Sequence, residues 1–190
     1  MSIIIASKIE NRVVMVGDSA ESFEVGVDIL TDKERLKVLR IGDVLVGSAG
    51  RVRNIRRLVE HPEWFDTKGA PFDKKFIVTK IIPRLFEDLS YHRILNTQED
   101  FPENRASVIM AHKDKIFLIT RSFAVYEVDK AVAVGCTKEL INPTLKDIKE
   151  GEELDTMLRL MRLSGELSSA VRPPYYYVDT ESFEYRYVEV

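Results

Sequence analysis

The order in which extended and helical patterns follow one another is the feature that most constrains this chain. Extended, β-branched segments come in groups, and a pair of helical patterns fills each of the two gaps between the groups. A doubly wound parallel sheet would instead alternate single strands with single helices. The order therefore predicts an α+β fold in which two antiparallel sheets stack and helices cover both outer faces. We expect this four-layer αββα sandwich to form a single domain over residues 1–190.

The expected elements follow from the period of the apolar residues. Strands are predicted at 2–8, 13–19, 35–41, 44–47, 106–111, 115–120, 123–127, 131–135, 175–178 and 183–190, with a short one around 24–30. Helices are predicted over roughly 51–61, 76–89, 138–149 and 154–167. Pro83 lies inside the second of these helices, and we expect it to start or kink that helix because proline lacks an N–H donor.

Composition argues against several classes of protein. The formal net charge of −3 provides no basic field for nucleic acid. No apolar run is long enough to cross a bilayer, and the first residues lack the pattern of a secretory signal. Cys136 is the single cysteine, which is typical of a reducing compartment, so a cytoplasmic protein is expected. The three histidines are far apart in the sequence, so we expect no metal site and no cofactor.

The first predicted strand begins almost at the first residue, in the stretch MSIIIASKIENRVVMVGDSAES. The side chain of Ser2 is small enough for ordinary removal of the preceding methionine. Removal would give Ser2 a free α-amino group, which can act as the base for the hydroxyl of the same residue. Such a site needs a cation that lowers the pKa of the amine and an acid that holds the cation in place. It also needs a backbone N–H that faces the developing oxyanion.

These residue types resemble a known family in their order and spacing. The interval from Ser2 to Asp18 resembles that from nucleophile to aspartate in the proteasome β subunit and the HslV-type peptidase, both N-terminal-nucleophile hydrolases. Later segments resemble further strands and helix starts of the same family. In chain order these segments are ERLKVLRIGDVLVGSAGR, ASVIMAHKDKIFLIT, AVAVGCTK and VRPPYYYVD. The resemblance covers essentially the whole chain, and it implies a divergent, proteasome-like peptidase.

The resemblance also implies a role for individual residues. Ser2 would be the nucleophile, Asp18 would orient the cation, and Gly47 would provide the N–H for the oxyanion. An ungapped match places Arg35 at the position of the family lysine, whereas a shift of two residues places Lys33 there. Because an even shift keeps the same face of a strand, the pattern leaves both assignments open. The choice matters because arginine stays protonated and does not replace lysine as a tuned cation.

Two supporting positions differ from the family pattern. Cys136 occupies the place of a serine, and Ser168 or a residue near it occupies the place of an aspartate. Three interpretations therefore remain: a peptidase, a non-catalytic structural or assembly subunit with the same fold, and a binding module unrelated to proteolysis. For the peptidase, the resemblance implies a homo-oligomeric ring, unfolded polypeptide as substrate and a separate AAA+ unfoldase ATPase as partner. Neither nucleic acid nor a membrane is expected as a partner.

Overall fold

The computed structural model describes residues 2–23, 26–29, 36–95, 103–104 and 106–188, and the statements below concern these residues. Its strands are β1 (Ile3–Ile9), β2 (Arg12–Gly17), β3 (Ala20–Phe23), β4 (Gly26–Ile29), β5 (Val38–Ile41), β6 (Val44–Gly50), β7 (Ala106–His112), β8 (Lys115–Ile119), β9 (Val125–Val128), β10 (Ala131–Gly135), β11 (Tyr175–Asp179) and β12 (Arg186–Val188). Its helices are α1 (Val52–Val59), α2 (Lys74–Phe76), α3 (Ile82–Tyr91), α4 (Lys138–Lys146) and α5 (Glu153–Leu167), with a 3-10 turn η2 (Pro62–Phe65) and a π-helical segment η3 (Ile77–Ile81).

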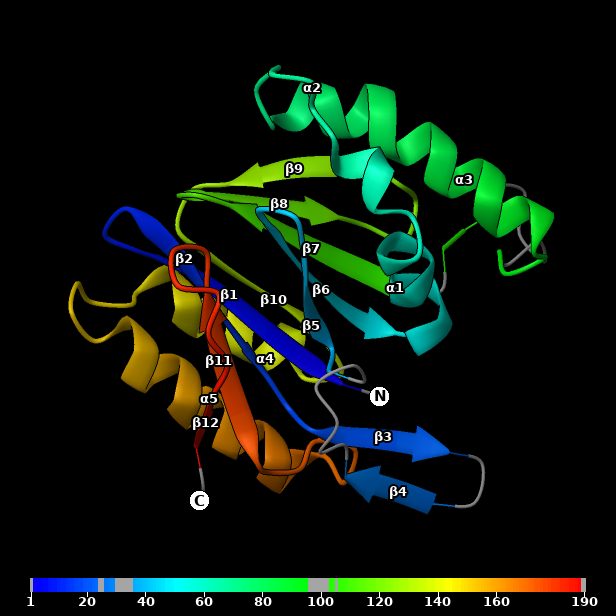
Figure 1. The fold of residues 1–190 in the computed structure, drawn as a ribbon. Helices are drawn as coiled ribbons and strands as arrows, with labels where there is room; N and C mark the ends of the chain where they lie inside the picture. The colour runs from blue at the N-terminus through cyan, green and yellow to red at the C-terminus, as the bar shows by residue number, and fades with distance from the viewer. Residues whose placement is uncertain (1, 24–25, 30–35, 96–102, 105, 189–190) are drawn as a thin grey trace.

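The strands form two five-stranded antiparallel sheets and a separate hairpin of β3 and β4. One sheet has the order β10-β1-β2-β11-β12, and the other has the order β5-β6-β7-β8-β9. Helices α4 and α5 cover the outer face of the first sheet, while α1, α2 and α3 cover that of the second (Figure 1). The predicted αββα sandwich is confirmed.

The buried apolar residues of β1 show why its sequence does not alternate with polar residues. Ile3 and Ile5 pack in a cluster with Met157 of α5, on the outer face of the first sheet. Ile4 packs in a different cluster with Leu45 of β6, between the two sheets. Successive side chains of a strand point to opposite faces, so a strand with a packed layer on each side needs apolar residues at every position.

Some boundaries differ from the predicted ones for local reasons. The helix expected at 76–89 extends from α2 through η3 into α3, and Pro83 lies in the first turn of α3. Pro83 has no N–H to donate, and it directly follows the π-helical segment, after the N–H of Ile82 has donated to the Ile77 carbonyl oxygen. The short strand expected around 24–30 corresponds, within the described residues, to β4, which pairs with the unpredicted strand β3.

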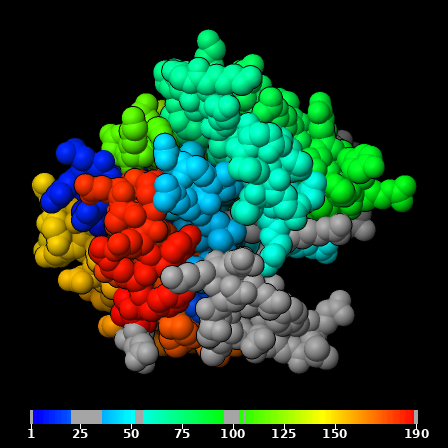
Figure 2. Space-filling model, viewed as in Figure 1, coloured from blue at the N-terminus to red at the C-terminus, as the bar shows by residue number. Residues whose placement is uncertain are grey.

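The C-terminal strands β11 and β12, with the residues that connect them, pack against the second sheet. Figure 2 shows them in red beside the light blue β5–β6 segment. The hydroxyl of Tyr185 donates to the Val38 carbonyl oxygen at 3.0 Å, and the Arg40 guanidinium lies 4.0 Å from the centre of the Phe183 ring. The end of the chain therefore contacts β5, the strand that begins beside the candidate site.

Candidate functional site

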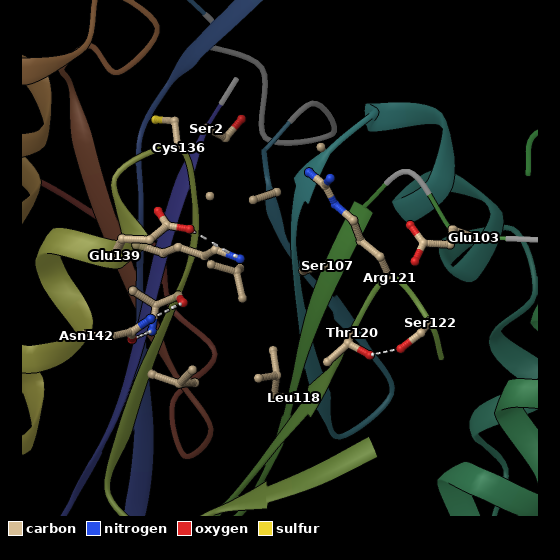
Figure 3. Close-up of a pocket in the computed structure, with 17 residues that line it drawn as sticks. Ser2, Glu103, Ser107, Leu118, Thr120, Arg121, Ser122, Cys136, Glu139 and Asn142 are labelled. Atoms are coloured by element: carbon tan, nitrogen blue, oxygen red, sulfur yellow. Dashed lines mark hydrogen bonds and ion pairs between the residues drawn. The ribbon is translucent and has the colours of Figure 1, made fainter. Parts of the chain in front are cut away.

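A pocket of about 630 Å³ opens beside Ser2, between the two sheets. Figure 3 shows Ser2 and Cys136 on one wall, with Thr120 and Arg121 on the wall opposite. Gly50, the last residue of β6, also lines the pocket. Ser2 itself is buried, and its carbonyl oxygen accepts the N–H of Cys136 at 3.0 Å. The start of the chain is thus held against β10 at the edge of a pocket large enough for a peptide side chain.

Asp18 follows β2 directly and is completely buried. One carboxylate oxygen accepts the N–H of Ile3 at 3.1 Å, and the other accepts the N–H of Ala20 at 3.1 Å. The second oxygen also binds the ammonium group of Lys37 in an ion pair whose two side chains are 0% and 3% exposed. The carboxylate therefore joins the residue after Ser2 to a buried cation on the facing sheet.

Opposing effects act on the protonation of Asp18. Removal from water raises the pKa of its carboxyl group. The Lys37 ammonium and the N–H groups of Ile3 and Ala20 oppose that rise, because each stabilises the ionised form. The carboxylate thus depends on Lys37 for its charge as much as Lys37 depends on the carboxylate for its position.

The cation that binds Asp18 was missed from the sequence. Lys33 and Arg35 lie outside the described residues, and both assignments stay predictions. In the sequence Lys37 has the same parity as these two residues, the parity that left both assignments open. The two-residue turn at Gly42-Asp43 sets the hairpin register that places Lys37 opposite Ser48, but this register does not specify which cation meets Asp18.

Gly47 lies inside the second sheet and is not among the residues that line the pocket. It pairs with Val38 on one side and with Ile109 on the other. The N–H of Ser48 donates to the carbonyl oxygen of Lys37 at 3.0 Å. Because successive N–H groups of a strand point to opposite sides, the N–H of Gly47 points away from Lys37 and toward β7.

Gly135 makes the close approach of the first strand to β10 feasible. Its φ is +130°, and a Cβ atom there would lie 1.9 Å from the carbonyl oxygen of Ser2. Only glycine leaves room at this point, so the residue before Cys136 determines how closely Ser2 can lie. The sulfur atom of the following residue, Cys136, lies 3.7 Å from the hydroxyl oxygen of Ser168.

The histidines lie away from this pocket. Although they are separated in sequence, the Nε2 atoms of His61 and His92 each lie 3.6 Å from the Asp88 carboxylate, which Arg57 also binds. Within the described part of the chain, no group of three or more His, Cys, Asp or Glu side chains is placed to hold a metal ion. None of the helices described there is long and apolar enough to span a membrane.

Sequence comparison does not assign the chain to a family. No protein-family model matches the chain. A stretch of 109 residues is 33% identical to UDP-N-acetylmuramoylalanine–D-glutamate ligase of Aquifex aeolicus, covering 55% of this chain. The chain spans about a quarter, 26%, of the length of that ligase. A match to so small a share of the ligase assigns no activity to this chain.

Solved structures resemble nearly the whole chain. Thiobacillus denitrificans BPH superposes with a TM-score of 0.70 at 17% identity, covering 93% of this chain and 96% of its own. Its complex with epoxomicin gives 0.69 at 16% identity, covering 93% and 97%. Anbu, an ancestral beta-subunit from Yersinia bercovieri, gives 0.68 at 12% identity, covering 97% and 86%. The likeness shows that the chain has the same fold as these structures.

Proposed function

We propose that this protein is a proteasome-like N-terminal-nucleophile peptidase, with Ser2 as the nucleophile once Met1 has been removed. One observation carries the proposal: a buried Asp18–Lys37 ion pair is bound through the Ile3 N–H to the strand that presents Ser2 to a pocket. A nucleophile that is its own base needs a nearby cation held by an acid, and this arrangement supplies both.

In the proposed reaction the neutral α-amino group of Ser2 takes the proton of its own hydroxyl. The oxygen then attacks a peptide carbonyl, and the C–N bond breaks as the amine leaves with that proton. An ester with Ser2 remains, and water hydrolyses it to release the acid and free the hydroxyl. Lys37 lowers the pKa of the amine, so that more of it is neutral at physiological pH, and Asp18 holds Lys37.

Lys37 replaces Lys33 and Arg35 in this proposal because it is the cation that binds Asp18 among the described residues. We also assign the oxyanion donor to Gly50 rather than to Gly47. Gly50 lines the pocket with Ser2. Alternation along β6 points its N–H to the same side as that of Ser48, which is the side of Lys37.

The same proposal includes the substrate and the assembly. Unfolded polypeptide would be cleaved inside a homo-oligomeric ring in the cytoplasm, with a separate AAA+ unfoldase feeding the chamber. The resemblance to an ancestral beta-subunit supports the ring. Native mass spectrometry of the purified protein tests it, and a strictly monomeric protein at micromolar concentration would argue against the ring.

A non-catalytic subunit is the second candidate, and the Cys136–Ser168 contact favours it. At these positions the family resemblance implies a serine and a carboxylate. Ser2 therefore lacks two polar side chains that accompany the nucleophile in that family. This candidate predicts that Met1 is retained, which would leave Ser2 without a free amine.

Intact-mass measurement followed by labelling with epoxomicin separates the two candidates. The peptidase predicts a mass without Met1 and covalent labelling by this peptide epoxyketone, whose reaction uses the hydroxyl and the amine of the terminal residue. Ser2→Ala should abolish labelling, while Ser90→Ala, which changes an exposed serine of α3, should keep it. A mass that includes Met1, or labelling that survives Ser2→Ala, would exclude the mechanism.

A further inference from the structure

Tyr176 has a contact that the proposed mechanism does not use. The residue lies in β11 of the first sheet, and its side chain is completely buried in the core between the sheets. Its hydroxyl oxygen accepts the N–H of Lys37 at 2.9 Å and the N–H of Val38 at 3.1 Å. A tyrosine of one sheet therefore binds the main chain of the other sheet at the point where β5 begins.

The local structure is adapted to this contact. Gly17 is the residue opposite Tyr176 on β2. A Cβ atom at Gly17 would lie 2.6 Å from the tyrosine hydroxyl oxygen, so any larger residue would displace the ring. Burial raises the pKa of Tyr176 strongly, and the hydroxyl therefore stays neutral. A neutral hydroxyl in a fixed place is a suitable acceptor for two backbone donors.

Lys37 is consequently held on both sides of its main chain. Its carbonyl oxygen accepts the N–H of Ser48 at 3.0 Å, and its own N–H is bound by Tyr176. Among the described residues, the ammonium group of Lys37 forms an ion pair with Asp18, and both side chains are buried. A shift of this main chain would move the ammonium group relative to the carboxylate.

We infer that Tyr176 is a positioning residue of the site: its hydroxyl fixes the main chain of Lys37, so that the ammonium group stays on Asp18 and close to the strand of Ser2. The catalytic consequence rests on the proposed peptidase function, whereas the effect on the position of Lys37 does not. Tyr176 is not among the residues that line the pocket, so its effect on the site passes through the main chain of Lys37 and Val38.

The test compares Tyr176→Phe with Tyr185→Phe. Both variants remove one hydroxyl that binds β5 or the residue before it, but the Tyr185 hydroxyl donates to the Val38 carbonyl oxygen, whereas that of Tyr176 accepts the N–H of Lys37. In Tyr176→Phe, Lys37 should move away from the Ser2 amine. The pKa of that amine should then rise, because a nearby cation lowers it. A rise of about one unit leaves roughly tenfold less neutral amine below that pKa, so peptide hydrolysis there should fall about tenfold.

The decisive readout is the rising limb of the pH–rate profile. It should move to higher pH in Tyr176→Phe and stay in place in Tyr185→Phe, even where both variants unfold at lower temperature. The charged residues of the pocket wall are unchanged in both variants; these are Glu103, Arg121, Lys138 and Glu139. Equal profiles in the wild type and Tyr176→Phe would overturn the inference.

Crystal structures of the two variants provide a readout that needs no activity. We expect Tyr176→Phe to lengthen or break the contact between Lys37 and Asp18, and Tyr185→Phe to keep it. If the wild type hydrolyses no peptide but Tyr176→Phe displaces Lys37, the proposed function fails and the positioning role stands. If Lys37 is unmoved in Tyr176→Phe, the positioning role fails whatever the activity of the wild type.

Discussion

Lys37→Met is the substitution that most directly tests the buried ion pair. Methionine keeps much of the length of the lysine side chain but removes its charge. The Asp18 carboxylate would then remain completely buried with the N–H groups of Ile3 and Ala20 as its described donors. Removal of one partner is costly because the other charge stays in a medium that solvates it poorly.

The expected loss can be worked out from the burial of the pair, whose side chains are 3% and 0% exposed. Breaking such a pair by removing one partner costs about 3–5 kcal/mol in the free energy of unfolding. For a domain of this size each kcal/mol lowers the melting temperature by roughly 2–4 °C. Lys37→Met should therefore melt about 6–20 °C below the wild type, while Lys80→Met, at an exposed position, should melt close to it.

The pH dependence of this loss gives a sharper test than its size. Without the ammonium group, the pKa of Asp18 in the folded protein rises further above the value of about 3.9 in the unfolded chain. A raised folded pKa gives stability that is complete below the unfolded pKa and is lost as the pH rises through the folded pKa. The difference between wild type and Lys37→Met should thus narrow as the pH falls from neutral toward about 4.

Thermal denaturation followed by circular dichroism, at constant protein concentration and over that pH range, measures both quantities. The reasoning would be refuted by a melting temperature within about 2 °C of the wild type, which is less than 1 kcal/mol. It would also be refuted by a difference that stays constant from neutral pH to about 4, because an uncompensated carboxylate must take up a proton there.

Three further outcomes follow from single contacts. Gly135→Ala should destabilise the protein far more than Gly151→Ala in thermal denaturation, because a Cβ meets an opposing carbonyl oxygen at 1.9 Å in the first case and nothing within 4 Å in the second. The hydrogen bond from Arg57 lowers the pKa of Asp88, so Asp88→Asn should cost about 3–12 °C at neutral pH, and denaturation scans should show this loss shrinking below pH about 4. Burial raises the pKa of Tyr185 to about 12, so ultraviolet titration should show it ionising near that pH and stability should fall as the pH rises above about 10.

Much of the fold could be predicted because residue patterns within short segments of the sequence specify it. Paired helical patterns between groups of strands specify the layers, and three consecutive isoleucines in the first strand suit a strand packed on both faces. The position of Asp18 beside the start of β1 is local as well, since a short hairpin connects the two, whereas its catalytic role stays a prediction from the family resemblance. The hairpin register makes Asp18 face the start of the chain, and the turn between the two strands determines that register.

The identity of the cation could not be predicted in the same way. Lys33, Arg35 and Lys37 share one strand parity, and only the packing of one sheet on the other decides which of them meets Asp18. The contact that holds Lys37 comes from Tyr176, which is 139 residues away in the sequence. Local periodicity carries no information about such a pairing, because it depends on how two sheets stack.

Burying the polar cluster of Asp18, Lys37 and Tyr176 costs free energy, so its presence in an apolar core needs an explanation. Taking two charges out of water is expensive, and well-packed apolar residues of similar volume often stabilise a protein as well as or better than a buried ion pair. The cluster of Asp18, Lys37 and Tyr176 is nonetheless placed among apolar residues, at the end of the core that borders the pocket of Ser2. Stability alone does not require three buried polar groups there. In the proposed peptidase they would control the charge beside Ser2, because a cation acts most strongly on an amine where water does not screen it and a fixed partner holds it.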